Sequence, residues 1–154
     1  MTGRFKMKTL KSITIIMVMG LFASACSISR QERNQAENMA WIKKNIGQNY
    51  IDDDSKALNI NVTPCRISWE EIWYINKIPR DTSFYSFNPG DAGQWTFKKD
   101  EGNRLIIISE SRIIERELTS GKKYYYSEFY LNDMEKDLGK KMTAALNDLS
   151  NFCK

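Results

Sequence analysis

Apolar and polar side chains alternate through the middle of the chain, and this pattern constrains the fold more than any other feature. In residues 66–75, RISWEEIWYI, the alternation puts on one side Ile67, Trp69, Glu71, Trp73 and Ile75. Similar short segments continue to residue 131, separated by turn-forming sequences such as NPGDAG and KDEGN. A period of two is typical of half-buried β-strands, and short links favour antiparallel neighbours. The sequence therefore predicts an antiparallel meander of about five or six strands.

One run in this series is unusually long for a single strand. Residues 105–118 begin as LIII and then change to an alternation of charged and apolar side chains. A β-bulge near Ser109 to Ser111 would account for the length, because an extra residue bends a strand without ending the pairing.

Helical periodicity flanks the strands on both sides. At the C-terminal end an apolar stripe recurs every three or four residues, at Met134, Leu138, Met142, Ala145, Leu149 and Phe152. Asn132 is the predicted N-cap, with Glu135 three residues later. A shorter helix is predicted from about residue 33 to 46, with Gly47 as its C-cap. A helix packed on one sheet face gives an α+β domain, which we assign to residues 39–154.

The first 25 residues have the three parts of a secretory signal peptide. Four basic residues precede an apolar run of about 10 residues, which is too short to span a bilayer. The run ends at Ala23-Ser24-Ala25, directly before Cys26. We interpret residues 1–25 as a signal peptide and residues 26–38 as a polar tether.

The sequence ASAC resembles the lipobox of bacterial lipoproteins, in which a lipid is attached to the cysteine thiol and a peptidase cuts before it. The class prefers Leu where this chain has Ala23. The resemblance implies lipidation of Cys26 and anchoring in the cell envelope, with the body in the periplasm. Ser27 after the cysteine implies sorting to the outer membrane. Ordinary cleavage after Ala25, leaving Cys26 as a free thiol, is the alternative.

If Cys26 is lipidated, Cys65 and Cys153 remain as an even pair in an oxidising compartment. A disulfide between them would close a loop of about 89 residues, for which the chain-entropy estimate is roughly 4 to 5 kcal/mol. We expect this disulfide; two free buried thiols are the alternative.

Charge argues against a nucleic-acid partner. The formal charge of +4 comes from Arg4, Lys6, Lys8 and Lys11, and without them 19 basic residues face 19 acidic ones. A neutral body lacks the basic surface that phosphate binding requires. The partners we expect are the membrane, through the lipid on Cys26, and a protein in the periplasm.

The sequence contains no histidine, so histidine-based catalytic groups are excluded. Glu70 and Glu71 are adjacent on a predicted strand and point to opposite faces, so they do not form a catalytic pair. The aspartates 52–54 lack the spacing of a calcium loop. We therefore predict no catalytic residue, no metal site and no cofactor; a small hydrolase acting on envelope material is the alternative.

Tyrosines provide the remaining signal. In residues 124–131 the alternation places on one face Tyr125, Phe129 and Leu131 and, on the other, Tyr124, Tyr126, Glu128 and Tyr130. If the Phe129 face packs on the C-terminal helix, the face with Tyr124, Tyr126 and Tyr130 stays partly open, and tyrosines beside a carboxylate suit protein or glycan contacts. Ordinary cross-strand packing is the other interpretation. The sequence as a whole favours a non-enzymatic binding protein, either an immunity or inhibitor protein or an accessory subunit of an envelope assembly.

Overall fold

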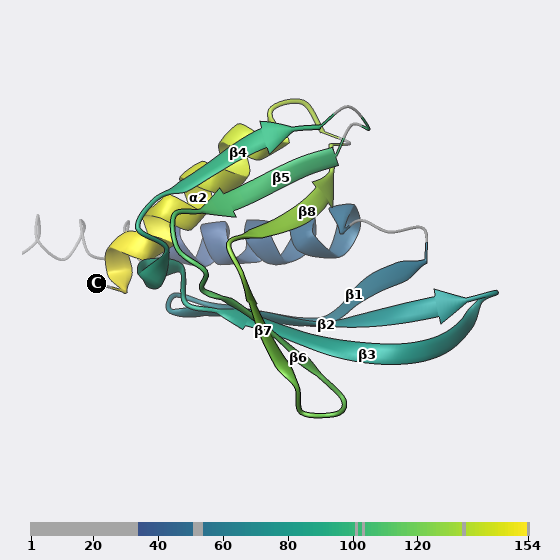
Figure 1. The fold of residues 1–154 in the computed structure, drawn as a ribbon. Coiled ribbons are helices and arrows are strands. Elements are labelled where there is room, and N and C mark those ends of the chain that lie inside the picture. Colours follow the sequence, from purple (N-terminus) through teal and green to yellow (C-terminus); the bar gives the residue numbers. More distant parts are fainter. Residues whose placement is uncertain (1–33, 51–53, 101, 103, 134, 154) are drawn as a thin grey trace, which may run out of the picture. The chain divides into compact units, whose positions relative to one another are not determined.

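A computed structural model describes residues 34–50, 54–100, 102, 104–133 and 135–153 (Figure 1). The predicted signal peptide, Cys26 with most of the predicted tether, Asp52, Asp53 and Met134 lie outside these ranges. One compact unit spans Glu37–Lys154 and contains both sheets and the C-terminal helix.

The predicted α+β class is confirmed, with antiparallel strands in two open sheets. A five-stranded sheet has the order β1-β2-β3-β6-β7, and a three-stranded sheet has the order β4-β5-β8. The strands of the first sheet are β1 (Ser55–Thr63), β2 (Arg66–Ile75), β3 (Ile78–Phe87), β6 (Ile114–Leu118) and β7 (Lys123–Tyr126). The second sheet contains β4 (Trp95–Lys99), β5 (Arg104–Ser109) and β8 (Glu128–Asn132).

The described residues form eight strands rather than five or six because two predicted strands are divided between the sheets. The run 105–118 becomes β5 and β6, and the run 124–131 becomes β7 and β8. Together they form one long antiparallel hairpin: Ile108 pairs with Glu128 in one sheet, and Ile114 pairs with Tyr126 in the other. Residues 109–113 therefore lie opposite Ser127 alone. The bulge predicted near Ser109 to Ser111 is instead the place where β5 ends and the hairpin leaves one sheet for the other.

Hydrogen bonds at Ser109 fix the position of this bend. The backbone N–H of Ser109 donates to the carbonyl oxygen of Ser127 at 2.7 Å. The Ser109 hydroxyl donates to the carbonyl oxygens of Ser111 and Ser127. Because Ser109 is buried, these bonds satisfy polar groups that would otherwise be costly inside the core.

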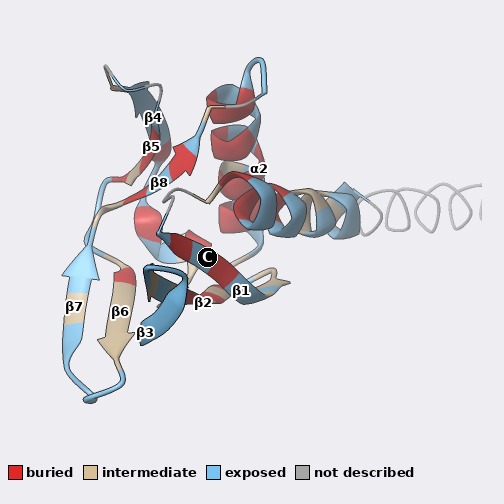
Figure 2. Ribbon diagram, turned by 90° about the vertical axis from the view of Figure 1, so that its right-hand side faces the viewer, coloured by how far each residue is buried: buried red, intermediate tan, exposed pale blue. Residues whose placement is uncertain are grey.

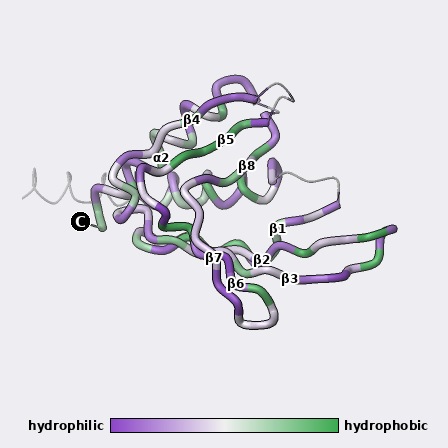
Figure 3. Tube along the Cα trace, in the orientation of Figure 1, coloured by the Kyte–Doolittle hydropathy of each residue, from purple (hydrophilic) through white to green (hydrophobic). Residues whose placement is uncertain are grey.

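A cluster of aromatic rings joins the two sheets. Trp69 and Phe87 belong to the five-stranded sheet, and Trp95 and Phe129 belong to the three-stranded sheet. Ring centroids lie 5.2 Å apart for Phe87 and Trp95 and 5.8 Å apart for Trp69 and Phe129, within the range of favourable aromatic contacts. Figure 3 shows β5 as a hydrophobic segment, which agrees with its buried residues Leu105, Ile106 and Ile107.

Helix α2 (Leu138–Phe152) packs on β4, β5 and the 3-10 helix η1 (Pro89–Ala92). Its buried face contains four residues of the predicted stripe, Leu138, Met142, Ala145 and Leu149. Figure 2 draws parts of the α2 ribbon in the red of buried residues. Gly139 permits the close approach, because a Cβ atom there would lie 2.4 Å from Cδ2 of Phe97.

The predicted start of this helix was wrong. Asn132 is the last residue of β8, where it pairs with Arg104, so its backbone is committed to the sheet. The helix begins at Leu138 and its N-cap position is occupied by Asp137, which has a left-handed φ of 63°.

The N-terminal helix covers the described residues 34–49, so the predicted C-cap at Gly47 was also wrong. Ile42 and Ile46 of this helix are fully buried. Gly47 lies inside the helix and close to β1: a Cβ atom there would be 3.1 Å from Cδ1 of Ile60.

Cys65 and Cys153 lie at disulfide distance, with their Cα atoms 5.3 Å apart. This places the end of α2 beside the turn between β1 and β2. Gly90 makes room for it, since a Cβ atom at residue 90 would lie 2.8 Å from the Cβ atom of Cys153. In the part of the chain that the structure describes, no helix has the length and apolar character to cross a bilayer.

Candidate functional site

The bend of the long hairpin opens a cleft of about 260 Å³ between the two sheets. Both sheets and the end of the N-terminal helix contribute to its lining, which consists of Tyr50, Glu71, Tyr85, Arg104, Arg116, Tyr126, Glu128, Phe129 and Tyr130. Four tyrosines, two arginines and two glutamates thus surround one concave space, with equal numbers of cations and anions.

Three of the four residues of the predicted binding face lie in this cleft: Tyr126, Glu128 and Tyr130. They remain on one side because Ser127 is the only residue between β7 and β8, so the alternation continues across the bend. Tyr126 and Tyr130 are 37% and 38% exposed, whereas Phe129 and Leu131 on the opposite face are buried.

Tyr124 does not line the cleft. It is half-buried on β7, and the ammonium group of Lys122 lies 4.9 Å from the centre of its ring. The structure therefore divides the predicted face, with three residues at the cleft and the fourth beside a lysine.

The floor of the cleft is a buried carboxylate. Glu71 is only 6% exposed, and its Oε1 accepts hydrogen bonds from the hydroxyls of Tyr50 at 3.1 Å and Ser55 at 3.5 Å. Its Oε2 accepts from the Tyr85 hydroxyl at 3.0 Å and lies 3.6 Å from Nη2 of Arg116. Three hydrogen bonds and one ion pair from inside the protein therefore engage both oxygens of Glu71.

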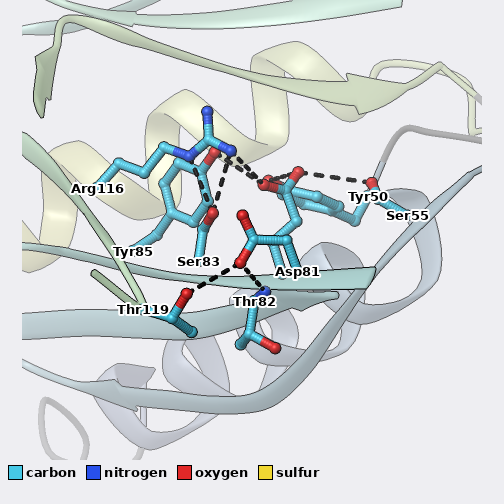
Figure 4. Close-up of polar contacts among 9 residues, drawn as sticks. Tyr50, Ser55, Asp81, Thr82, Ser83, Tyr85, Arg116 and Thr119 are labelled. Carbon is cyan, nitrogen blue, oxygen red and sulfur yellow. Dashed lines mark hydrogen bonds and ion pairs between the residues drawn. The ribbon is translucent and has the colours of Figure 1, made fainter. Parts of the chain in front are cut away.

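Arg116 is held on two sides. Its Nε and Nη2 donate to the hydroxyl of Ser83 at 3.1 and 3.0 Å, and its guanidinium carbon lies 5.6 Å from the centre of the Tyr85 ring. Tyr85 in turn stacks on Trp69, with centroids 5.0 Å apart and planes 3° from parallel. Figure 4 shows the guanidinium of Arg116 above Ser83 and beside Tyr85.

These surroundings raise the pKa values of the two tyrosines that bind Glu71. Burial raises the pKa of Tyr50 well above its ordinary value, and the negative charge of Glu71 raises it further. Burial also raises the pKa of Tyr85, with added contributions from Tyr50 and Glu71. Both hydroxyls therefore keep their protons, and remain donors to Glu71, far above neutral pH.

The pKa of the Arg116 guanidinium is raised although its burial acts in the opposite direction. The neighbouring Tyr85, Tyr126 and Glu71 favour the charged form and outweigh the burial. Arg116 is therefore a permanent cation in the cleft.

Sequence reasoning missed five of the residues that line the cleft: Tyr50, Glu71, Tyr85, Arg104 and Arg116. The alternation in β2 did predict Glu71 on the same side as Trp69, next to bulky aromatic side chains. A lone carboxylate in such a stripe was the available signal, because a buried charge requires partners from elsewhere in the chain.

A second polar cluster lies on the other face of the five-stranded sheet. Glu115 accepts a hydrogen bond from the ammonium group of Lys123 at 2.7 Å and another from the hydroxyl of Tyr125 at 3.0 Å. Lys123 also lies 3.4 Å from Glu117. Tyr125 is 53% exposed, so this cluster is in contact with solvent.

The described residues contain no group of three or more Asp, Glu or Cys side chains placed to hold a metal ion. In comparisons with known proteins, no family model, no curated protein and no solved structure matches this chain. A functional assignment therefore depends on the geometry of the cleft, which combines exposed tyrosine rings with the guanidinium of Arg116, held by Ser83 and Tyr85.

Proposed function

We propose that this protein is a lipid-anchored lipoprotein of the bacterial envelope that binds another protein without catalysing a reaction. The observation that supports this most is the gathering of Tyr126, Tyr130 and Glu128 at the mouth of a cleft. Tyrosine and arginine are enriched at protein interfaces, where a rigid ring provides contact area at a small entropic cost. The partner is a toxin that the protein neutralises, or a subunit of an envelope assembly.

The anchoring part of the proposal rests on the sequence. The lipobox-like ASAC and the basic-apolar segment before it favour a lipid on Cys26, and Ser27 favours the outer membrane. A tether of 12 residues between Cys26 and Met39 would let the body extend into the periplasm. Several acyl chains together hold a protein at a membrane far better than one chain does.

Glu71 and Glu128 line the same cleft, which raises the question of a two-carboxylate hydrolase. Such an enzyme needs both carboxylates free, one to exchange a proton with the substrate and the other to activate water or attack. The four contacts to Glu71 occupy both of its oxygens. The arrangement suits a group that positions Arg116 and two tyrosines, and it favours binding over hydrolysis.

The test is capture of the partner from detergent-solubilised membranes by the full-length tagged protein, followed by mass spectrometry. We expect a protein partner captured in stoichiometric amount. The captured amount should fall at least tenfold when Tyr126 and Tyr130 are both changed to Ala. Tyr125→Ala is the matched control, because Tyr125 is more exposed than Tyr126 or Tyr130 but lies on the other face of the sheet. Thermal unfolding of each variant checks that the fold is retained.

Two results would contradict the proposal. If the variant with Tyr126 and Tyr130 changed to Ala captures as much partner as the wild type, the interface lies elsewhere. Turnover of peptidoglycan or lipid by the purified protein would favour the hydrolase. The anchor is tested separately: Cys26→Ser should abolish labelling by a fatty-acid analogue, and persistent labelling would refute the lipobox interpretation.

A further inference from the structure

Arg116, at the floor of the cleft, has one nitrogen that is available to bind a ligand. Two of its nitrogens, Nε and Nη2, are directed at Ser83 and Glu71. Figure 4 shows the remaining nitrogen, Nη1, pointing away from Ser83. Among the described residues none accepts a hydrogen bond from Nη1 of Arg116 within 3.5 Å.

Glu71 does not neutralise this cation by a close ion pair. The distance of 3.6 Å between Nη2 and Oε2 is longer than a hydrogen bond, whereas the hydroxyls of Tyr50 and Tyr85 bind the carboxylate at 3.1 and 3.0 Å. The hydroxyl groups thus stabilise the negative charge of Glu71. Arg116 keeps the capacity to bind a second anion through Nη1.

A second guanidinium stands at the rim. Arg104 donates from Nε to a carboxylate oxygen of Asp100 at 2.6 Å, and its guanidinium carbon lies 5.8 Å from the centre of the Tyr130 ring. Within the described ranges its two terminal nitrogens form no hydrogen bond. The cleft therefore offers guanidinium donors from both Arg104 and Arg116, each beside a tyrosine ring.

We propose that this cleft recognises a single carboxylate on the partner protein, an Asp or Glu side chain that forms an ion pair with Nη1 of Arg116 between Tyr126 and Tyr130. The inference deepens the proposed protein-binding function and rests on it. Guanidinium groups match carboxylates in shape and charge, and such pairs are strongest where water is excluded. A volume of about 260 Å³ admits one side chain rather than a folded segment.

Charge balance favours a carboxylate over a phosphate group. The cleft already contains the carboxylates of Glu71 and Glu128 opposite the two arginines. A phosphate would add close to two negative charges to this balanced set, whereas a carboxylate adds one. Like charges close together are destabilising, so we expect phosphate to bind more weakly.

The test uses the full-length protein in detergent micelles and three small probes at constant ionic strength. They are N-acetyl-glutamate amide, the corresponding glutamine compound as an uncharged control of the same shape, and inorganic phosphate. The readout is the side-chain Nε–H resonance of Arg116, which the hydrogen bond to Ser83 should keep observable, assigned by its loss in Arg116→Lys. We expect a saturable shift with the glutamate probe and at least tenfold weaker binding of the other two probes.

If the glutamine compound binds as tightly as the glutamate probe, or phosphate binds more tightly, the inference is overturned. This comparison uses the wild-type protein, so it does not depend on the folding of a variant. Arg116→Lys removes the planar donor and should weaken binding of the glutamate probe at least tenfold. Because the Arg116 resonance is absent in this variant, binding is followed on the tyrosine ring resonances. Arg80→Lys is the matched control, an exposed arginine of β3 outside this cleft, and should leave binding unchanged.

Partner capture separates this inference from the proposed function. If Arg116→Lys retains the partner while the Tyr126 and Tyr130 variant loses it, the cleft is the interface but carboxylate recognition is wrong. If both variants retain the partner, the proposed function of the cleft is wrong, whatever the probes show.

Discussion

Two glutamates on opposite faces of the five-stranded sheet have similar partners and different surroundings. Glu71 accepts hydrogen bonds from tyrosine hydroxyls and faces Arg116, and Glu115 accepts from Tyr125 and Lys123. The strand register places Glu71 on the face that contains Trp69 and Tyr85, and Glu115 on the face that contains Ser68 and Ser86. One carboxylate is buried at the floor of the cleft, and the other is in contact with solvent.

The difference shows that the same chemical groups have unequal effects on stability according to their access to water. An exposed ion pair gains little, because water already solvates both charges and salt screens them. A buried carboxylate has given up its hydration, so its hydrogen-bonding partners become necessary for the fold. We therefore expect the cleft network to be rigid and cooperative and the outer cluster to be nearly dispensable.

The largest expected effect comes from removing the buried carboxylate. Glu71→Ala leaves Arg116 without its buried counter-ion and two tyrosine hydroxyls without their acceptor, which should lower the free energy of unfolding by about 3 kcal/mol. This is the low end of the range for broken buried pairs, because the Arg116 side chain is 25% exposed. Urea unfolding measures the change.

Glu115→Ala is the matched substitution on the outer face and should change the free energy of unfolding by at most about 0.5 kcal/mol. Equal losses for the two variants would show that the contrast in burial does not control the stability of these pairs.

The sequence predicts some of this contrast and misses the rest. A period of two places Tyr126, Glu128 and Tyr130 on one side and keeps Leu131 inside, because the alternation depends only on neighbouring residues. It cannot show that Ser127 divides the run between two sheets. That division depends on a hydrogen bond to Ser109, 18 residues away.

The floor of the cleft was beyond sequence reasoning for the same reason. The partners of Glu71 come from the N-terminal helix region, β1, β3 and β6, at Tyr50, Ser55, Tyr85 and Arg116. No local pattern connects these positions, since only the pairing of strands brings them together.

Alternation also fails to show where a strand extends past its neighbours. Trp73 and Ile75 share a side with the buried Trp69, yet they are 40% and 54% exposed. They lie toward the tip of the β2–β3 hairpin, where β1 pairs no further than Trp73 and β6 pairs only with residues 83–86. Figure 1 shows this hairpin extending beyond β1 and β6.

An intermediate effect is expected at alkaline pH. The pKa values of Tyr50 and Tyr85 are raised in the folded protein, so the unfolded chain loses these protons first, near pH 10. The stabilisation is complete below pH 10 and declines above it, by about 1.4 kcal/mol per pH unit for each hydroxyl that stays protonated in the folded state. Urea unfolding between pH 8 and 11 should show this decline.

Tyr85→Phe should make the alkaline decline shallower, because the substituted ring has no proton to lose. Tyr125→Phe provides the comparison on the outer face. The hydrogen bond to Glu115 raises the pKa of Tyr125 as well, but this side chain is exposed, so the slope should stay close to that of the wild type. A similar change of slope in both variants would remove the distinction between the two faces.

The smallest effect is expected at acid pH, on the outer face. The hydrogen bond from Lys123, followed by that from Tyr125, holds the pKa of Glu115 below its ordinary value. The resulting stabilisation is present above about pH 4.5 and is lost as the pH falls through the lower value of the folded state. Glu115→Gln should therefore lose less stability than the wild type between pH 5 and 3, by roughly 0.3 kcal/mol.

Salt distinguishes this exposed pair from a buried one. At 1 M NaCl the screening length falls to about 3 Å. Glu115→Gln and the wild type should then lose the same stability between pH 5 and pH 3. Unfolding curves at low and high salt measure it at pH 5 and at pH 3. A difference above 1 kcal/mol, or one that salt leaves unchanged, would mean that Glu115 is as dependent on its partners as Glu71. The outer face would then have to be treated as a second structured site rather than as a solvated surface.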